Sequence, residues 1–341
     1  MGYVRRPYDL NADDVYVDLG EVLDRPVIVK CESFNFAGSV KLKAAVSMVT
    51  AAEADGRLRP DSVIVESSSG NLGVALSVVA ASRGYGFVCV TDPRSSVQNR
   101  RQIEALGGQV IVVTEPDGDH GFLGSRLRRV RHLCENNPDY VWLNQYANEH
   151  NWRAHYTTTA PEIVRRVPGL DVLFVGAGTT GTLTGCARYL RDIGHPAQVI
   201  AVDSIGSVTF GGLPSPRYIP GLGTGKRPEI VDESVIDDIV MVAELDTIRM
   251  CRTLAGAGFL FGGSTSTVLV GAQRWLAANG GPATCAVAIS PDLGERYLDT
   301  IYNDMWVAEH FGAEFLASLR PGPSEPDVRP GELISPLVGG V

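Results

Sequence analysis

The chain has 341 residues, of which 44% are hydrophobic and 20% charged, and this balance is typical of a soluble globular protein large enough for two domains. Lys and Arg number 30 against 39 Asp and Glu, so the net charge of −9, without a long basic run, argues against nucleic acid or an anionic membrane as a partner. With no long apolar stretch and no apolar signal sequence at the N-terminus, the chain is predicted to be cytoplasmic. The six cysteines are scattered without a C-x-x-C pair, so neither disulfides nor a metal site is expected.

The first predicted elements are a strand over 27–32 and a helix that starts behind Gly38 and Ser39. Ser39 is the expected cap, which places Lys41 and Lys43 in the first helical turn. A cation there opposes the helix dipole, and the neutral amine that results suits a Schiff base with an aldehyde cofactor. The alternative is that both lysines are solvated surface residues, as most lysines are.

The next segment alternates strands with helices, which predicts right-handed βαβ units and a parallel sheet. Residues 142–148 are expected to form a polar connection after the last helix of this segment. The strands are predicted over 62–66, 86–91 and 109–113, and the helices over 71–83, 97–106 and 121–136.

A second α/β unit is predicted to begin near residue 150. Its glycine- and proline-rich stretch 206–228 is too long for an ordinary connection and is expected to cover a site. The proline-rich tail from residue 320 is expected to be an ordered strap or a disordered end. The remaining helices are predicted over 152–166, up to 193, over 246–257, over 265–278 and from about 294, and the strands over 171–175, 198–203 and 283–289.

Two loops of small residues between a strand and a helix carry the chemistry. Residues 176–181 fit the glycine pattern of dinucleotide-binding proteins, with Asp203 at the end of the next strand, but the hydroxyls of Thr179, Thr180 and Thr182 suit a phosphate monoester equally well. Residues 67–73 offer hydroxyls and amides at a helix N-terminus, where a carboxylate would be stabilised. A nicotinamide-dependent oxidoreductase therefore stays open beside a phosphate-bearing cofactor, and either loop could also be a turn without a ligand.

Four motifs in order resemble those of the fold-type II pyridoxal-phosphate enzymes, the cysteine synthase and cystathionine β-synthase group. The segment 35–41 is similar to the lysine motif, 68–73 to the substrate-carboxylate loop, 178–182 to the phosphate cup, and 294–297 to a late signature of cysteine synthases. The details at 66–73, at 144–149 with Trp152, and at 291–299 look closest to N-(2-amino-2-carboxyethyl)-L-glutamate synthases, which begin 2,3-diaminopropionate synthesis for siderophores and antibiotics.

The resemblance implies two parallel-sheet α/β domains of the tryptophan synthase β-like architecture. Residues 36–150 would form a smaller mobile domain, 1–35 with 151–312 a larger domain that binds the cofactor phosphate, and 313–341 a tail. It further implies pyridoxal 5'-phosphate as cofactor, a homodimer, and amino-acid substrates that react by β-replacement on O-phospho-L-serine with the amine of L-glutamate.

The resemblance also assigns roles. Lys41 would hold the cofactor and move the α-proton. Cysteine synthases place a serine where this chain has Leu293, so Ser264 becomes the candidate partner of the pyridine nitrogen. The other cofactor-binding residues would be Asn71, Gly178, Thr179, Thr180, Gly181 and Thr182, and the substrate-binding residues Ser68, Ser69, Gly70, Leu72, Gln145, Tyr146 and Arg126.

The alternatives are a cysteine synthase that uses sulfide with O-phosphoserine or O-acetylserine, the NAD(P)-dependent oxidoreductase, and a catalytically silent binding module that keeps the fold. A visible spectrum separates these classes, because a Schiff base of pyridoxal phosphate absorbs in the visible range and a nicotinamide enzyme does not.

Overall fold

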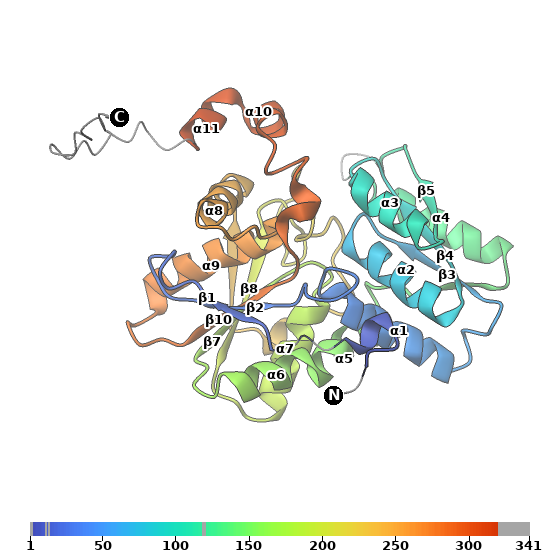
Figure 1. Ribbon diagram of the computed structural model, residues 1–341, viewed down its shortest axis with the longest axis horizontal. Helices are drawn as coiled ribbons and strands as arrows, with labels where there is room; N and C mark the ends of the chain where they lie inside the picture. The colour runs from blue at the N-terminus through green and yellow to red at the C-terminus, as the bar shows by residue number, and fades with distance from the viewer. Residues whose placement is uncertain (1–2, 11, 13, 118–120, 320–341) are drawn as a thin grey trace, which may run out of the picture.

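Two α/β lobes lie side by side in the computed structural model, which describes residues 3–10, 12, 14–117 and 121–319 (Figure 1). The smaller lobe has a four-stranded parallel sheet in the order β5-β4-β3-β6. Its strands are β3 (Val63–Ser67), β4 (Gly86–Thr91), β5 (Gln109–Val112) and β6 (Tyr140–Trp142). Its helices are α1 (Lys41–Ala54), α2 (Asn71–Arg83), α3 (Val97–Ala105) and α4 (Leu123–Asn136).

The larger lobe is built on a six-stranded sheet in the order β1-β2-β10-β7-β8-β9, parallel except for the edge strand β1. Its strands are β1 (Tyr16–Asp18), β2 (Ile28–Cys31), β7 (Val172–Gly176), β8 (Gln198–Ser204), β9 (Asp238–Val242) and β10 (Ala286–Ser290). Its helices are α5 (Glu149–Thr157), α6 (Thr159–Arg166), α7 (Gly181–Asp192), α8 (Glu244–Gly256), α9 (Gly263–Asn279), α10 (Asp304–Phe311) and α11 (Ala313–Ser318).

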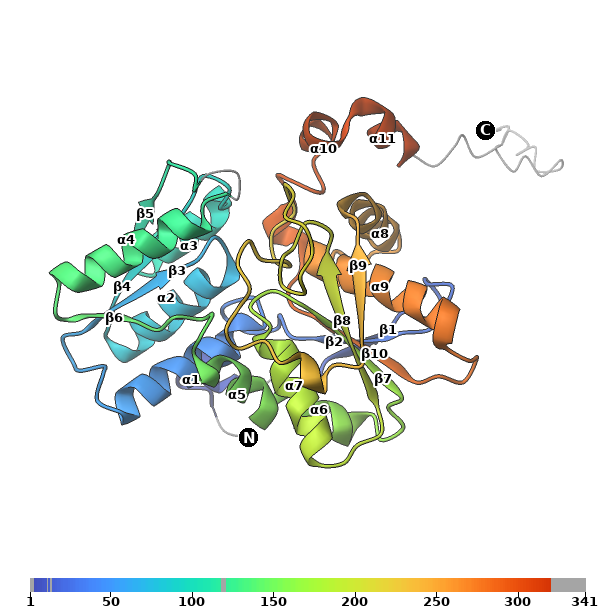
Figure 2. The ribbon, with the colours of Figure 1, turned by 180° about the vertical axis from the view of Figure 1, so that it is seen from behind.

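Helices cover both faces of the large sheet, as expected for strands that are apolar on both sides. Met250 of α8 and Trp275 of α9 share one core with Phe174, whereas Ile163 of α6 and Leu190 of α7 lie in the core of the opposite face. Figure 2 shows α8 and α9 on one side of this sheet and α6 and α7 on the other. The carboxyl ends of β3, β7 and β10 carry the loops that form the site, the usual place in open parallel sheets.

The fold confirms the predicted class of two parallel α/β units and corrects several local predictions. Ser39 does not cap α1: the helix begins at Lys41 behind Val40, and the Ser39 hydroxyl has no hydrogen-bond partner among the described residues. The polar connection predicted from residue 142 is preceded by β6, which completes the small sheet.

Two predicted helices also differ from the structure. The helix predicted over 152–166 is two helices, α5 and α6, separated at Thr158, which has φ −126° and ψ −72°. The helix predicted from 294 is a short 3-10 turn, Gly294–Tyr297, followed later by α10. The tail predicted from residue 320 lies outside the described residues. In the described part of the chain, no helix is long and apolar enough to cross a membrane.

Candidate active site

A cavity of about 580 Å³ lies between the lobes, within the range of small-molecule sites. The small lobe contributes Lys41, the loop from Ser68 to Leu72, Arg126, Gln145 and Tyr146. The large lobe contributes Gly178, Thr179, Arg296, Tyr297 and part of the loop that follows β8. Most residues that the sequence assigned to a site therefore meet in one place. Thr180, Gly181, Thr182 and Ser264 are not among the lining residues.

Lys41 is the first residue of α1, and the preceding Val40 N–H donates to the carbonyl of Pro291 at 2.8 Å. This bond ties the start of the helix to the segment that follows β10. Desolvation lowers the pKa of Lys41 to about 8, while the carboxylate of Asp292 opposes the shift. A larger fraction of this amine is therefore neutral near pH 7 than of an ordinary lysine, which favours attack on an aldehyde.

The buried carboxylate of Asp292 joins the two lobes. It accepts hydrogen bonds from Asn71 Nδ2 at 2.7 Å, from Ser264 Oγ at 3.2 Å, and from the Tyr297 hydroxyl. Burial raises the pKa of Asp292, and the donors oppose that rise. Ser264, the predicted partner of the pyridine nitrogen, is thus held by a carboxylate, and Leu293 packs against the core of the large sheet.

Arg296, in the late motif at 294–297, contacts the lysine motif at 35–41 and the start of α2. It donates to Asn71 Oδ1 at 2.6 Å and to the carbonyl of Ala37. Gly38 has φ +62°, and a Cβ there would lie 2.6 Å from Arg296 Nη2. Only glycine fits both the left-handed backbone and the close approach of the guanidinium. Together with the bond from Asn71 Nδ2 to Asp292, the bond from Arg296 fixes the orientation of the Asn71 amide.

The Ser-rich loop after β3 is held by its own hydrogen bonds. Ser68 Oγ accepts from the N–H groups of Gly70 and Gly73 at 3.2 and 3.0 Å, so it shapes the turn, while Ser69 is the more exposed hydroxyl. Gln145 Nε2 donates to the carbonyl of Ser67 at 2.8 Å. The loop and Gln145 therefore present a fixed set of donors at the N-terminus of α2, where a carboxylate is stabilised.

The predicted phosphate cup is the turn between β7 and α7. Thr180 has φ +67° and ends the turn, and its buried hydroxyl has no partner among the described residues. Asn151 Nδ2 donates to Thr179 Oγ1 at 3.0 Å. His155 bridges two hydroxyls, Thr182 at 3.2 Å and Thr159 at 3.0 Å, and burial keeps its pKa well below the usual value, so the ring is neutral.

These residues fit pyridoxal phosphate in two respects. The cofactor has an aldehyde, for which Lys41 is a suitable amine, and a phosphate dianion, for which the α7 N-terminus and the free Thr180 hydroxyl are suitable donors. A Cβ on Gly178 would lie 3.0 Å from the carbonyl of Gly221, so a side chain there would need the Gly221 backbone to shift. Lys41, Thr180 and the amides around Gly181 would hold the group.

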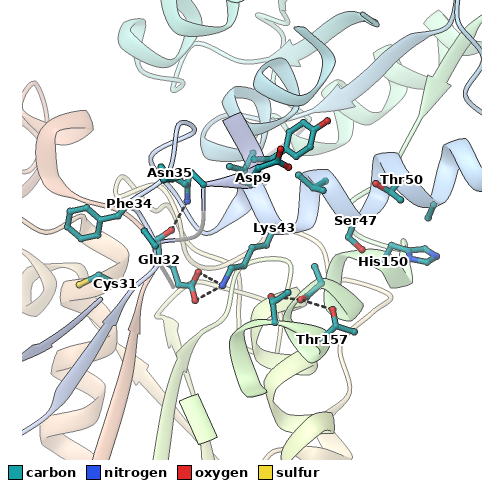
Figure 3. Close-up of a pocket in the computed structure, with 18 of the residues that line it drawn as sticks. Asp9, Cys31, Glu32, Phe34, Asn35, Lys43, Ser47, Thr50, His150 and Thr157 are labelled. Carbon is teal, nitrogen blue, oxygen red and sulfur yellow. Dashed lines mark hydrogen bonds and ion pairs between the residues drawn. The ribbon is translucent and has the colours of Figure 1, made fainter. Parts of the chain in front are cut away.

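Lys43, two residues after Lys41, faces a different cavity of about 720 Å³ beside α1 (Figure 3). Its ammonium contacts Glu32 at 3.0 Å and Glu162 at 3.3 Å, and Lys30 is part of the same ionic group. Figure 3 shows Lys43 directed toward Glu32. The ion pairs hold the Lys43 side chain away from the predicted cofactor site, which distinguishes it from Lys41.

Arg126 of α4 is 7% exposed and faces the cavity beside Tyr146. Its Nε lies 3.3 Å from Asp92 Oδ2, and its Nη1 has no hydrogen-bond partner among the described residues. A buried guanidinium with a free N–H is suited to bind an anion.

Sequence reasoning missed Asp292, Arg296 and His155 as site residues. Their functions depend on contacts with residues more than a hundred positions away or on another helix, which periodicity does not reveal. Asp292 lies two residues after the apolar strand β10, and a carboxylate at the carboxyl end of a buried strand was the available signal.

The chain belongs to the family of pyridoxal-phosphate dependent enzymes, which it matches over residues 17–291. Its cofactor is therefore pyridoxal 5'-phosphate, and the nicotinamide alternative has no support. It is 39% identical over 83% of its length to N-(2-amino-2-carboxyethyl)-L-glutamate synthase of Ralstonia nicotianae, 84% of which is covered.

Two further comparisons support membership of this family. The same synthase of Cupriavidus metallidurans is 37% identical, with 84% of this chain and 85% of that protein covered. The crystal structure of O-ureido-L-serine synthase superposes with a TM-score of 0.81 at 36% identity, covering 90% of this chain and 100% of that one.

Proposed function

We propose that this protein joins O-phospho-L-serine and L-glutamate to give N-(2-amino-2-carboxyethyl)-L-glutamate and phosphate. The observation that carries the proposal is the 37–39% identity to two synthases of that name over most of the chain. The bond from the serine β-carbon to the phosphate oxygen breaks, and a bond from the same carbon to the glutamate nitrogen forms. The α-proton is removed and returned, and the attacking amine loses a proton.

Pyridoxal phosphate supplies an electron sink that stabilises negative charge at the substrate α-carbon. The protein supplies the remaining functions. Lys41, with its lowered pKa, holds the cofactor and then moves the α-proton. Ser69 and the amides up to Leu72 bind the α-carboxylate, and Gln145 fixes the loop by its bond to Ser67. Asn71 and Ser264, both held by Asp292, bind the ring of the cofactor.

Arg126 supports phosphate as the leaving group. A phosphate monoester is dianionic near neutral pH, whereas an acetyl ester is neutral, so the unpartnered guanidinium N–H favours the phosphate. Tyr146 lines the same wall and is a second contact for the leaving group or the nucleophile. A cysteine synthase that uses sulfide is the second candidate, because it would need the same first half-reaction.

The finer features inferred from the sequence are part of this proposal. Residues 36–150 form the mobile domain, 1–35 with 151–312 the cofactor domain, and 313–341 the tail. The protein is a cytoplasmic homodimer, and its product leads to 2,3-diaminopropionate for a siderophore or antibiotic.

The test is to incubate the purified protein with O-phospho-L-serine and a panel of amines and sulfide, and to identify products by mass spectrometry. We expect the glutamate adduct with one phosphate released per adduct. If cysteine forms from sulfide faster than the glutamate adduct forms, the proposal is wrong and the protein is a cysteine synthase.

A further inference from the structure

A second, smaller cavity of about 200 Å³ borders the first one. The two cavities share Ser69, Arg94, Arg126 and Tyr146 among their lining residues, so they lie next to each other. The far wall of the smaller cavity includes Arg217, which lies in the long loop after β8 and does not line the first cavity.

Arg217 is partly buried and has donors to spare. One Nη donates to the carbonyl of Leu222 at 3.0 Å, which fixes the guanidinium, and the buried Nε has no hydrogen-bond partner among the described residues. With Arg94 and Arg126 it is the third guanidinium that lines the smaller cavity, against one lining carboxylate, Asp92, which pairs with Arg126. Like charges gathered in this way favour an anion between them.

The carboxylates of Asp203 and Glu244 lie near Arg217, but neither forms an ion pair with it among the described residues. Glu244 accepts three hydrogen bonds from the N–H groups of Tyr218 and Ile219. Asp203 accepts from Ser204 N at 2.8 Å, and burial raises its pKa to about 6, so part of its population is neutral near pH 6. Neither lines the smaller cavity. The opposing role for Arg217 is a structural one, in which Asp203 and the arginine anchor the loop.

We propose that Arg217 binds the side-chain carboxylate of the incoming amine and so selects a dicarboxylic amino acid as the nucleophile. The inference rests on the proposed function, because it concerns the second substrate of the same reaction. The departing phosphate leaves the space beside Arg126 empty. The amine then approaches the reacting carbon past the residues that line both cavities. An amino acid with an acidic side chain can place its nitrogen at the reacting carbon and its far carboxylate on Arg217.

The experiment compares Arg217→Met and Arg217→Lys with wild-type holoenzyme. We expect Arg217→Met to raise KM for L-glutamate about tenfold or more with little change in kcat, and to narrow the preference for glutamate over glutamine. The lysine variant, which keeps the charge, should restore part of the loss. The burst of phosphate from O-phospho-L-serine alone, without an amine, should keep its rate and amplitude.

Arg227→Met is the matched control, because Arg227 lies in the same loop and also donates to a backbone carbonyl, that of Thr209 at 2.8 Å. It should leave KM for glutamate unchanged. Calorimetry of glutarate binding to the holoenzyme gives a readout independent of turnover, and Arg217→Met should weaken it.

Failure of this inference is separable from failure of the proposed function. If wild-type protein forms no glutamate adduct, the proposed function is wrong and the inference is wrong with it. If wild type forms the adduct but Arg217→Met keeps its KM for glutamate, only the inference is wrong. If Arg217→Met slows the phosphate burst by the same factor by which it lowers kcat/KM for glutamate, Arg217 has a structural role and the inference is wrong.

Discussion

Lys41 and Lys43 differ in their surroundings, although both stand in the first turn of α1. Lys41 lines the cavity between the lobes, and Lys43 is paired with Glu32 and Glu162 in another cavity. We expect Lys41→Ala to lose the visible absorbance of the bound cofactor and all turnover. Lys43→Ala should stay coloured and active, with reduced stability. A colourless Lys43→Ala beside a coloured, active Lys41→Ala would reverse the assignment.

The pKa of Lys41, lowered to about 8 by desolvation, predicts a pH dependence. Only the neutral amine attacks an aldehyde, so the rate at which apoenzyme combines with pyridoxal phosphate should rise with pH and level off above about 8. Since Asp292 opposes the shift, Asp292→Asn should lower the pKa further and move the profile to lower pH. Stopped-flow absorbance measures both profiles. A rate that keeps rising to pH 10 would contradict the lowered pKa.

Arg126 should determine the choice of leaving group. Removing a charge-assisted hydrogen bond costs about 1.5–3 kcal/mol, so Arg126→Met should lower kcat/KM for O-phospho-L-serine by about 10- to 100-fold. The neutral ester O-acetyl-L-serine should be affected much less.

Asp92 loses its ion pair in this variant, so the test is the ratio of the two donors within each protein. The control is Arg128→Met on the same helix, where the side chain is 60% exposed. An equal loss with both donors would mean that Arg126 has a structural role only.

The candidate site residues that the sequence points to most directly are those with a local signature. A lysine behind a Gly-Ser turn and two small-residue loops after apolar strands are visible in the chain, and the structure brings them to one cavity. The role of Asp292 was harder to predict, because a carboxylate at the end of a buried strand does not reveal that it contacts Asn71 and Ser264, which are distant in the sequence.

At the scale of elements, segments with a strong apolar pattern between clear turn residues were predicted with the right bounds, whereas the break at Thr158 and the short edge strands were not predicted. The helix over Asn71–Arg83 and the strand over Gly86–Thr91 occur with the predicted bounds, because each has a strong apolar pattern between clear turn residues. The edge strands β1, β6 and β9 were missed. They have three to five residues and are only partly buried, so pairing rather than pattern defines them.

The turn before α1 gives a prediction for this scale. Gly38→Ala should destabilise the fold by about 1–2 kcal/mol through its left-handed backbone alone, and should also displace Arg296, whose Nη2 would lie 2.6 Å from the new Cβ. Turnover should fall as well, because Arg296 holds Asn71.

Gly56→Ala is the matched control, with φ +75° and nothing within 4 Å of the new Cβ. It should lose stability but keep its activity. Urea unfolding and steady-state rates measure the two effects, and equal activity losses in both variants would refute the contact with Arg296.

At the scale of the whole molecule, the cavity lies between two lobes that each supply part of it. We expect substrate carboxylate bound at Ser69 to draw the lobes together and keep water from the substrate after phosphate has left. Ser69→Ala should then raise the fraction of turnovers that end in pyruvate and ammonia instead of the adduct. Pyruvate per adduct is measured at saturating glutamate. An unchanged ratio with a higher KM for O-phospho-L-serine would mean that the loop binds substrate without controlling closure.

The order of the strands along the chain allows the two lobes to fold at different times during synthesis. All strands of the small sheet come from residues 63–142, whereas the large sheet pairs β2, at residues 28–31, with β10, at residues 286–290. During synthesis the chain can therefore complete the small sheet before β10, the partner of β2 more than 250 residues away, has been made. Lys41 lies between the two, so the residue proposed to hold the cofactor is placed early on its helix but is enclosed only when Pro291 and Asp292 have been synthesised.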